Sequence, residues 1–129
     1  MILVDTSVWI EVFKQPSGID LEAHLDLDEI ATCLPVVQEV LQGFRDESAF
    51  RKAREAMLSF PVVESPLSEG IFIDAVELYR FARRNGLTVR SSVDCLIASC
   101  ALRNDLTVLH RDRDFASLAK VSGLKERLV

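Results

Sequence analysis

Four acidic residues stand where carboxylates of an α/β protein could do chemistry. Asp5 directly follows the apolar run Ile2-Leu3-Val4, and Asp112 follows a second apolar run near the end of the chain. Glu39 and Asp94 lie in the first turns of two predicted helices. If these carboxylates converge they repel one another, which raises carboxyl pKa values unless a cation enters. Mg²⁺ or Mn²⁺ takes carboxylate and water oxygens and can activate water for phosphoryl transfer, so the pattern indicates a metal-dependent site.

Each of these residues also has a purely structural explanation. Asp5 or Asp112 could simply help to start the helix that follows it. Glu39 could be a solvated residue beside an apolar stripe. Asp94 has capping-box spacing from a preceding serine, and its charge would favour the helix dipole. Asp114, two residues after Asp112, could be a surface residue. No other nucleophile constellation is present, since the sequence has no Gly-rich phosphate loop, no G-x-S-x-G motif and no Cys–His spacing.

Strand and helix signals alternate along the chain, which predicts an α/β fold. The expected architecture is a three-layer α/β/α sandwich with a mainly parallel sheet of four to five strands. Strands are predicted at Ile2–Val4, Ile30–Cys33, Pro61–Glu64 and Thr107–His110, with an edge strand over Leu124–Val129. The first predicted helix begins at Val8, with Ser7 as the N-cap, and a turn is predicted at Pro16-Ser17-Gly18. Further helices are predicted over 19–27, from Pro35 to Phe44, over 47–60 and from Glu69 to about Asn85. The last two are predicted to begin after Ser91 or Ser92 and at Arg111.

Length and composition restrict the class of protein further. The 129 residues predict one domain over 1–129, and 49% hydrophobic residues are ordinary for a compact protein. No apolar stretch is long enough for a membrane span and no signal peptide is visible, so we expect a cytoplasmic protein without a membrane partner. Three cysteines without a C-x-x-C pair and two histidines predict buried free thiols and exclude a histidine-rich metal site.

The net charge of −5 has the wrong sign for a protein that binds nucleic acid over its whole surface. It suits a pocket that concentrates divalent cations, or a surface that awaits a basic partner. Arg80, Arg83, Arg84 and Arg90 nevertheless cluster before the helix that contains Asp94, and they could either contact an RNA backbone or form a solvated charged face.

Taken together, the acidic segments resemble the PIN-domain family, and within it the VapC-type toxins of bacterial toxin–antitoxin pairs. The resemblance spans the whole chain, and the order and spacing of the acidic residues match throughout. The motifs that carry it are Val4-Asp5-Thr6-Ser7, Pro35-Val36-Val37-Gln38-Glu39, Ser92-Val93-Asp94 and His110-Arg111-Asp112-Arg113-Asp114-Phe115.

This resemblance implies a Mg²⁺-dependent endoribonuclease, in which Mn²⁺ can substitute, on a five-stranded parallel sheet. By the same resemblance the catalytic and metal-binding acids are Asp5, Glu39, Asp94 and Asp112, Asp114 is a further candidate ligand, and Thr6 and Ser7 support the first aspartate. Toxins of this branch usually form homodimers, cut structured RNA that is often transfer RNA, and are silenced by an antitoxin over the active site. The implied partners are therefore an RNA substrate, a cognate VapB-type antitoxin and a second copy of the chain.

The apolar residues are consistent with such a dimer. Two segments, Val8–Phe13 and Ile71–Ile73, are more apolar than one helix face needs, and excess apolar surface often marks an interface. We therefore expect a symmetric homodimer.

Two other classes of protein remain as alternatives. A receiver-type phosphoacceptor domain needs adjacent acids after its first strand and an acceptor aspartate after its third. Here Asp5 is followed by Thr6, and the third predicted strand ends in Glu64-Ser65-Pro66. A catalytically inactive PIN-like binding module would lack a member of the acidic quartet, and none is missing.

Overall fold

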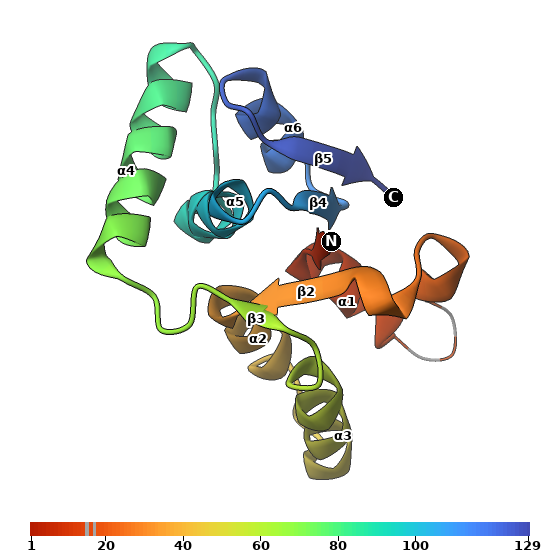
Figure 1. Cartoon of the computed structure of the whole chain (residues 1–129). Helices are drawn as coiled ribbons and strands as arrows, with labels where there is room; N and C mark the ends of the chain where they lie inside the picture. The colour runs from red at the N-terminus through yellow and green to blue at the C-terminus, as the bar shows by residue number, and fades with distance from the viewer. Residues whose placement is uncertain (15, 17) are drawn as a thin grey trace.

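The protein contains a five-stranded parallel sheet with the strand order β3-β2-β1-β4-β5 (Figure 1). The computed structural model describes every residue except Gln15 and Ser17, so the predicted turn at Pro16-Ser17-Gly18 lies partly outside the described residues. The strands are β1 Ile2–Val4, β2 Ile30–Cys33, β3 Val62–Val63, β4 Thr107–His110 and β5 Lys125–Leu128. The predicted α/β class and the number and direction of the strands are confirmed.

Helices connect the strands, and most of them begin near the predicted residue. Their bounds are α1 Thr6–Val12, α2 Leu34–Leu41, α3 Glu47–Met57, α4 Glu69–Arg84, α5 Ser92–Arg103 and α6 Arg113–Lys120. The prediction that Ser7 caps α1 was wrong, because Asp5 has extended backbone angles and its carboxylate accepts the Ser7 N–H. The N–H groups in the first turn of a helix have no partner within the helix. The short side chain of Asp5 places its carboxylate where it can accept such an N–H from the residue two positions later.

The helix predicted over 19–27 was also wrong. This segment forms two short 3₁₀ helices, η1 Leu21–Ala23 and η2 Leu27–Glu29. Both begin after an extended aspartate, Asp20 and Asp26, and aspartate favours caps over helix interiors. Leu21 and Leu25, which defined the expected apolar face, are still buried.

Strand β1 is the centre of the sheet, and it is buried on both faces. Ile2, Leu3 and Val4 are all buried although successive side chains of a strand point to opposite faces. Helices must therefore cover both sides of the sheet, which gives the predicted three layers.

The topology favours a ligand site next to β1. On one side of β1 the chain adds β2 and then β3. It then returns to the other side of β1, where it adds β4 and then β5, so the strand order reverses at β1. In open α/β sheets ligands bind at the carboxyl ends of the strands where the strand order reverses. That position lies between β1 and β4, where Val4 is paired with Leu109 and the Asp5 N–H donates to the Leu109 carbonyl at 2.9 Å.

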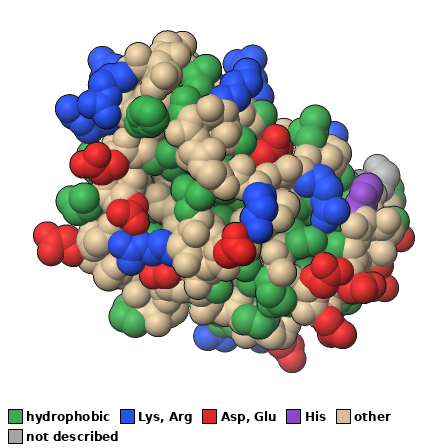
Figure 2. Space-filling view, turned by 45° about the horizontal axis from the view of Figure 1, so that its top comes forward, with side chains coloured by type: hydrophobic (Ala, Val, Ile, Leu, Met, Phe, Trp, Pro, Cys, Tyr) green, Lys and Arg blue, Asp and Glu red, His purple; other side chains and the backbone are tan. Residues whose placement is uncertain are grey.

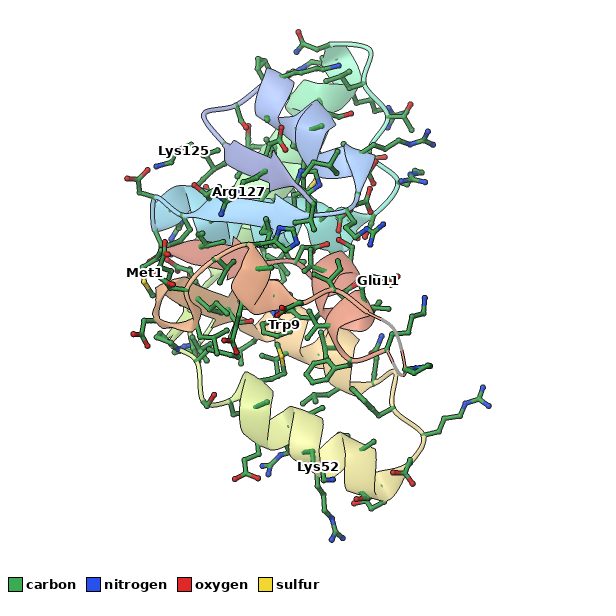
Figure 3. All side chains as sticks on the ribbon, turned by 90° about the vertical axis from the view of Figure 1, so that its right-hand side faces the viewer. Met1, Trp9, Glu11, Lys52, Lys125 and Arg127 are labelled. Carbon is green, nitrogen blue, oxygen red and sulfur yellow. The ribbon has the colours of Figure 1, made fainter. Side chains whose placement is uncertain are left out.

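Most apolar side chains of α1 pack in the core of the molecule. Trp9 is buried and lies in contact with Phe13 and Phe60, with ring centroids 5.8 and 5.5 Å away. Figure 3 shows Trp9 directed into the molecule, whereas Lys52 on α3 points outward. The expected apolar excess of the first segment is therefore mostly core packing, although Ile10 is exposed.

Two further expectations concern the cysteines and the membrane. Cys33, Cys95 and Cys100 are buried free thiols, as predicted. Among the described residues, no helix combines the length and apolar character that a membrane crossing needs.

Candidate metal centre

Asp5 lies where β1 ends and α1 begins, and it is only 3% exposed. Its Oδ2 accepts the backbone N–H of Ser7 at 3.0 Å and the Ser7 hydroxyl at 2.6 Å. The Ser7 Oγ in turn accepts the N–H of Arg111 at 3.0 Å, which joins the end of β1 to the segment after β4. The Asp5 Oδ1 is buried and has no hydrogen-bond partner among the described residues. Burial raises the pKa of Asp5, and the bonds from Ser7 partly oppose this effect.

Asp94 lies in the first turn of α5 and is 6% exposed. Ser91 makes no side-chain capping bond, so the capping-box explanation for Asp94 does not hold. Burial is the largest of the effects that raise the pKa of Asp94 to about 8, and the negative charges of the surrounding carboxylates add to it. These carboxylates are, in decreasing order of effect, Asp5, Asp112, Asp114 and Glu39.

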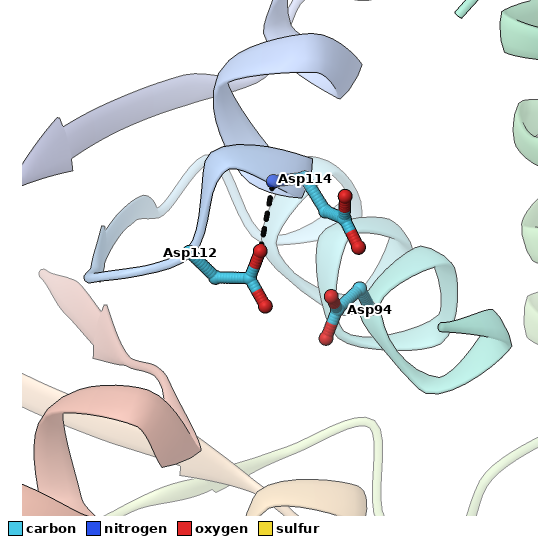
Figure 4. Close-up of side chains that lie close together, drawn as sticks. All are labelled: Asp94, Asp112 and Asp114. Atoms are coloured by element: carbon cyan, nitrogen blue, oxygen red, sulfur yellow. Dashed lines mark hydrogen bonds between the residues drawn. The ribbon is translucent and has the colours of Figure 1, made fainter. Parts of the chain in front are cut away.

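Asp112 and Asp114 face Asp94 across the site (Figure 4). Each of the three residues offers a carboxylate oxygen, and these oxygens all lie within 4.8 Å of one another. Asp112 is also the N-cap of α6, since its Oδ1 accepts the Asp114 N–H at 2.9 Å. The capping explanation and convergence on the site are therefore both correct for Asp112. Asp114 is buried rather than a surface residue.

Glu39 belongs to the rim of the same cluster. It lies on α2, is half-buried, and its Oε1 accepts the Thr6 hydroxyl at 2.8 Å. Thr6 therefore holds Glu39, whereas Ser7 holds Asp5. The resemblance to the family had suggested that the hydroxyls of both Thr6 and Ser7 support Asp5. The bond from Thr6 to Glu39 depends on a contact between α1 and α2, which spacing along the chain does not reveal.

The four arginines before α5 separate into two groups. Arg80, Arg83 and Arg84 are exposed near the end of α4, and none of them forms an ion pair within the described part of the chain. Arg90 instead contacts the acidic cluster, with its Nη2 3.1 Å from the Asp112 Oδ1 and its Nε 3.5 Å from the Asp114 Oδ1. The Arg90 backbone N–H also donates to the Asp114 Oδ2 at 3.1 Å.

His110 and Glu126 position Asp112, and sequence reasoning gave them no role at the site. His110 is buried at the end of β4, and its Nδ1 accepts the Asp112 N–H at 3.1 Å. Because Nδ1 is the acceptor, the ring proton lies on Nε2, which bonds the carboxylate of Glu126 on β5. Only the spacing of His110 and Asp112 hinted at this contact, and nothing in the sequence pointed to Glu126.

The residues present fit a hard divalent cation. Buried carboxylate oxygens normally have hydrogen-bond partners, but the Asp5 Oδ1 and the Asp94 Oδ2 have none among the described residues. Both side chains are more than nine-tenths buried and approach further carboxylates. An all-oxygen donor set with mutual repulsion is the environment that Mg²⁺ or Mn²⁺ stabilises.

Comparison with known proteins agrees with this geometry. The family model of the PIN domain matches residues 2–121. This chain belongs to the PIN-domain family. The chain is 37% identical to VapC ribonuclease Mb1587 of Mycobacterium bovis and to Ribonuclease VapC11 of Mycobacterium tuberculosis, with 97% of this chain and 96% of each relative covered. This similarity places it in the VapC-type branch of PIN-domain proteins.

Solved structures of other proteins share the fold. The structure of VapBC2 from Rickettsia felis bound to a promoter DNA fragment matches with a TM-score of 0.76 at 19% identity, over 100% of this chain and 99% of that one. FitAcB from Neisseria gonorrhoeae matches with a TM-score of 0.73 at 18% identity, over 98% and 96% of the two chains. At these identities the likeness establishes the arrangement of strands and helices.

Proposed function

We propose that this protein is a Mg²⁺-dependent endoribonuclease, with Mn²⁺ as a substitute, and the toxin of a VapBC-type toxin–antitoxin pair. The observation that carries the proposal is the gathering of carboxylates near Asp94, together with two buried oxygens, the Asp5 Oδ1 and the Asp94 Oδ2, that have no hydrogen-bond partner among the described residues. Relatives that are 37% identical are named ribonucleases, which supports RNA as the substrate.

The acids have different roles in this proposal. Asp5 and Asp94 hold the ion, since their free oxygens are buried and close enough to repel. A bound ion would lower the pKa of a water molecule and offset negative charge on the phosphoryl group. Glu39 or Asp112 accepts the proton of the attacking water, because both are only partly buried and lie beside that pair. Thr6 fixes Glu39, and Ser7 fixes Asp5.

We assign structured RNA, and transfer RNA in particular, as the substrate class, with the reaction in the cytoplasm. Arg80, Arg83 and Arg84 are exposed near the end of α4, where they can follow a phosphate backbone. Figure 2 shows basic, acidic and hydrophobic side chains interspersed on the face drawn, so local groups of arginines rather than an overall positive charge would attract RNA.

Metal binding tests the proposal directly. Titration with Mn²⁺, followed by calorimetry or electron paramagnetic resonance, should show binding by the wild type and at least roughly tenfold weaker binding by Asp5→Asn, because the variant loses a charged ligand. Asp28→Asn is the matched control, since Asp28 is exposed in η2 and lies outside the acidic cluster. Equal affinity in the wild type and Asp5→Asn would remove Asp5 from the metal site.

A VapB-type antitoxin is the second partner that we propose. The buried carboxylate oxygens that lack a hydrogen-bond partner in the described structure and the net charge of −5 favour a basic partner. A bidentate arginine can neutralise paired carboxylates. We expect an antitoxin tail to place an arginine or lysine in the pocket, and replacement of that residue by alanine to release ribonuclease activity. Hydrogen exchange of the complex should show protection at Asp5 and Asp94. Protection confined to remote segments would contradict this mode of inhibition.

We also propose a symmetric homodimer, with α4 at its interface. Ile71 is buried in the core, but Phe72, Ile73 and Val76 are 48–53% exposed. Phe72 and Val76 help to line a largely apolar groove of about 450 Å³ between α4 and α5, together with Ala75, Tyr79, Val93 and Leu96 among others.

Sedimentation should therefore show a dimer at roughly tens of micromolar protein, a concentration at which even a weak interface is occupied. Ile73→Asp should produce a monomer, because a charge within an apolar interface is costly. Ile10→Asp, at a similarly exposed position on α1, should remain dimeric. A monomeric wild type under these conditions would exclude the proposed dimer.

A further inference from the structure

Arg90 contacts only two of the carboxylates in the acidic cluster, those of Asp112 and Asp114. On one side its guanidinium contacts Asp112 and Asp114, and its backbone N–H bonds the second oxygen of Asp114. Both oxygens of Asp114 are therefore engaged by the same residue. On the other side, the Asp5 Oδ1 and the Asp94 Oδ2 are buried and have no partner among the described residues.

The charge of Arg90 is permanent, and its position is defined by more than one bond. A guanidinium does not lose its proton in proteins, and its planar shape suits contacts with two carboxylates at once. The side chain is 54% exposed, so these contacts leave part of the guanidinium open to solvent above the acids. One unit of positive charge is thus built into the Asp112–Asp114 side of the pocket.

We propose that Arg90 occupies the place of a second divalent ion, so that the pocket binds one such ion, on the Asp5–Asp94 side. The inference rests on the metal dependence proposed above. Two-metal sites of phosphoryl-transfer enzymes hold their ions roughly 3.5–4 Å apart, each on shared carboxylates. Here the carboxylates that a second ion would need already bind a cation at 3.1–3.5 Å, and that cation would repel a second ion.

Two roles follow for the residues concerned. Asp114 anchors Arg90 instead of binding the ion, although it lies in the acidic triad with Asp94 and Asp112. Arg90 is a positioning residue that acts through Asp112 and Asp114. Its partly exposed guanidinium also supplies, at a fixed place, the positive charge that a second metal ion would bring to a phosphate.

The number of bound ions tests this inference. We would titrate the full chain with Mn²⁺ to millimolar concentration and count bound ions by electron paramagnetic resonance. The wild type should bind one ion per chain, and Arg90→Gln should bind two. Arg80→Gln changes the net charge equally at an exposed position on α4 away from the acidic cluster, and it should bind one. Arg90→Lys keeps the positive charge, and it should also bind one.

Other ion counts would contradict either the role of Arg90 or the proposed metal dependence. Two ions in the wild type, two in Arg90→Lys, or one in a folded Arg90→Gln would overturn the role of Arg90 and leave the proposed nuclease function intact. Absence of bound Mn²⁺ from every protein would instead overturn the metal dependence on which both proposals rest. If Arg90→Gln does not fold, as judged by circular dichroism, Arg90→Met removes the same charge and should bind two ions, and one ion in a folded Arg90→Met would overturn the role of Arg90.

Discussion

Replacement of Asp94 by asparagine is expected to reduce RNA cleavage by roughly three orders of magnitude or more, since it removes a charged metal ligand at the reacting centre. Asparagine has the same shape as aspartate, and within the described part of the chain the buried Asp94 Oδ2 accepts no hydrogen bond, so the fold should persist. Single-turnover cleavage of a labelled RNA in Mg²⁺ measures the loss, with Asp28→Asn as the control. Activity within about tenfold of the wild type would exclude Asp94 from the mechanism.

The same substitution should stabilise the metal-free protein. The pKa of Asp94 is about 8 in the folded state, above the ordinary value of 3.8, so the folded protein retains a proton that the unfolded chain releases between these values. The free energy of unfolding should therefore fall as pH rises from about 4 to about 8.

Asp94→Asn removes this contribution, and near pH 8 it should raise the free energy of unfolding by up to a few kcal/mol. Urea unfolding in EDTA at pH 5 and pH 8 measures the effect. An unchanged pH dependence in Asp94→Asn would show that the repulsion at Asp94 is not a determinant of stability.

Chelation of divalent cations should have an equally large effect. Excess EDTA should abolish cleavage, because no pair of histidines is present to activate the ribose 2′-hydroxyl: His24 lies near η1, and His110 already bonds Asp112 and Glu126. Mg²⁺ or Mn²⁺ should restore activity. Attack by water in line with the leaving group should yield fragments with 5′-phosphate and 3′-hydroxyl ends.

Mapping of the fragment ends distinguishes this mechanism from its alternatives. Cleavage that persists in EDTA, or fragments that end in 2′,3′-cyclic phosphate, would exclude metal-assisted hydrolysis. A catalytically inactive PIN-like module would cleave under neither condition. The acids argue against that alternative, since the burial of Asp5 and Asp94 close to other carboxylates is unfavourable without a cation.

The sequence was sufficient to predict the sheet and the location of the acids. Short apolar runs such as Ile2–Val4 can be buried on both faces only within a covered parallel sheet, and their carboxyl ends must meet at one edge. Asp5 and Asp112 follow such runs directly. Glu39 and Asp94 were placed by their positions in the first turns of two predicted helices, and the PIN-domain motifs then gave the four acids a common role.

The partners of individual polar groups could not be predicted. Arg90 had been grouped with Arg80, Arg83 and Arg84 as a candidate RNA contact, yet it binds Asp112 and Asp114, which follow it by more than twenty residues in the chain. The contact between His110 and Glu126 depends on the pairing of β4 with β5. Such bonds follow from strand register and side-chain rotamers, which hydrophobic periodicity does not determine.

The central position of β1 determines when the site can form during protein synthesis. Ile2–Val4 is synthesised well before one of its two neighbours in the sheet, Thr107–His110. Asp5 therefore meets Asp112 only after that segment has emerged, and pairing across so long a stretch of chain is slow. A nascent chain that stalls or is cleaved before Thr107 carries no assembled acidic pocket, so such a product should lack the proposed ribonuclease activity.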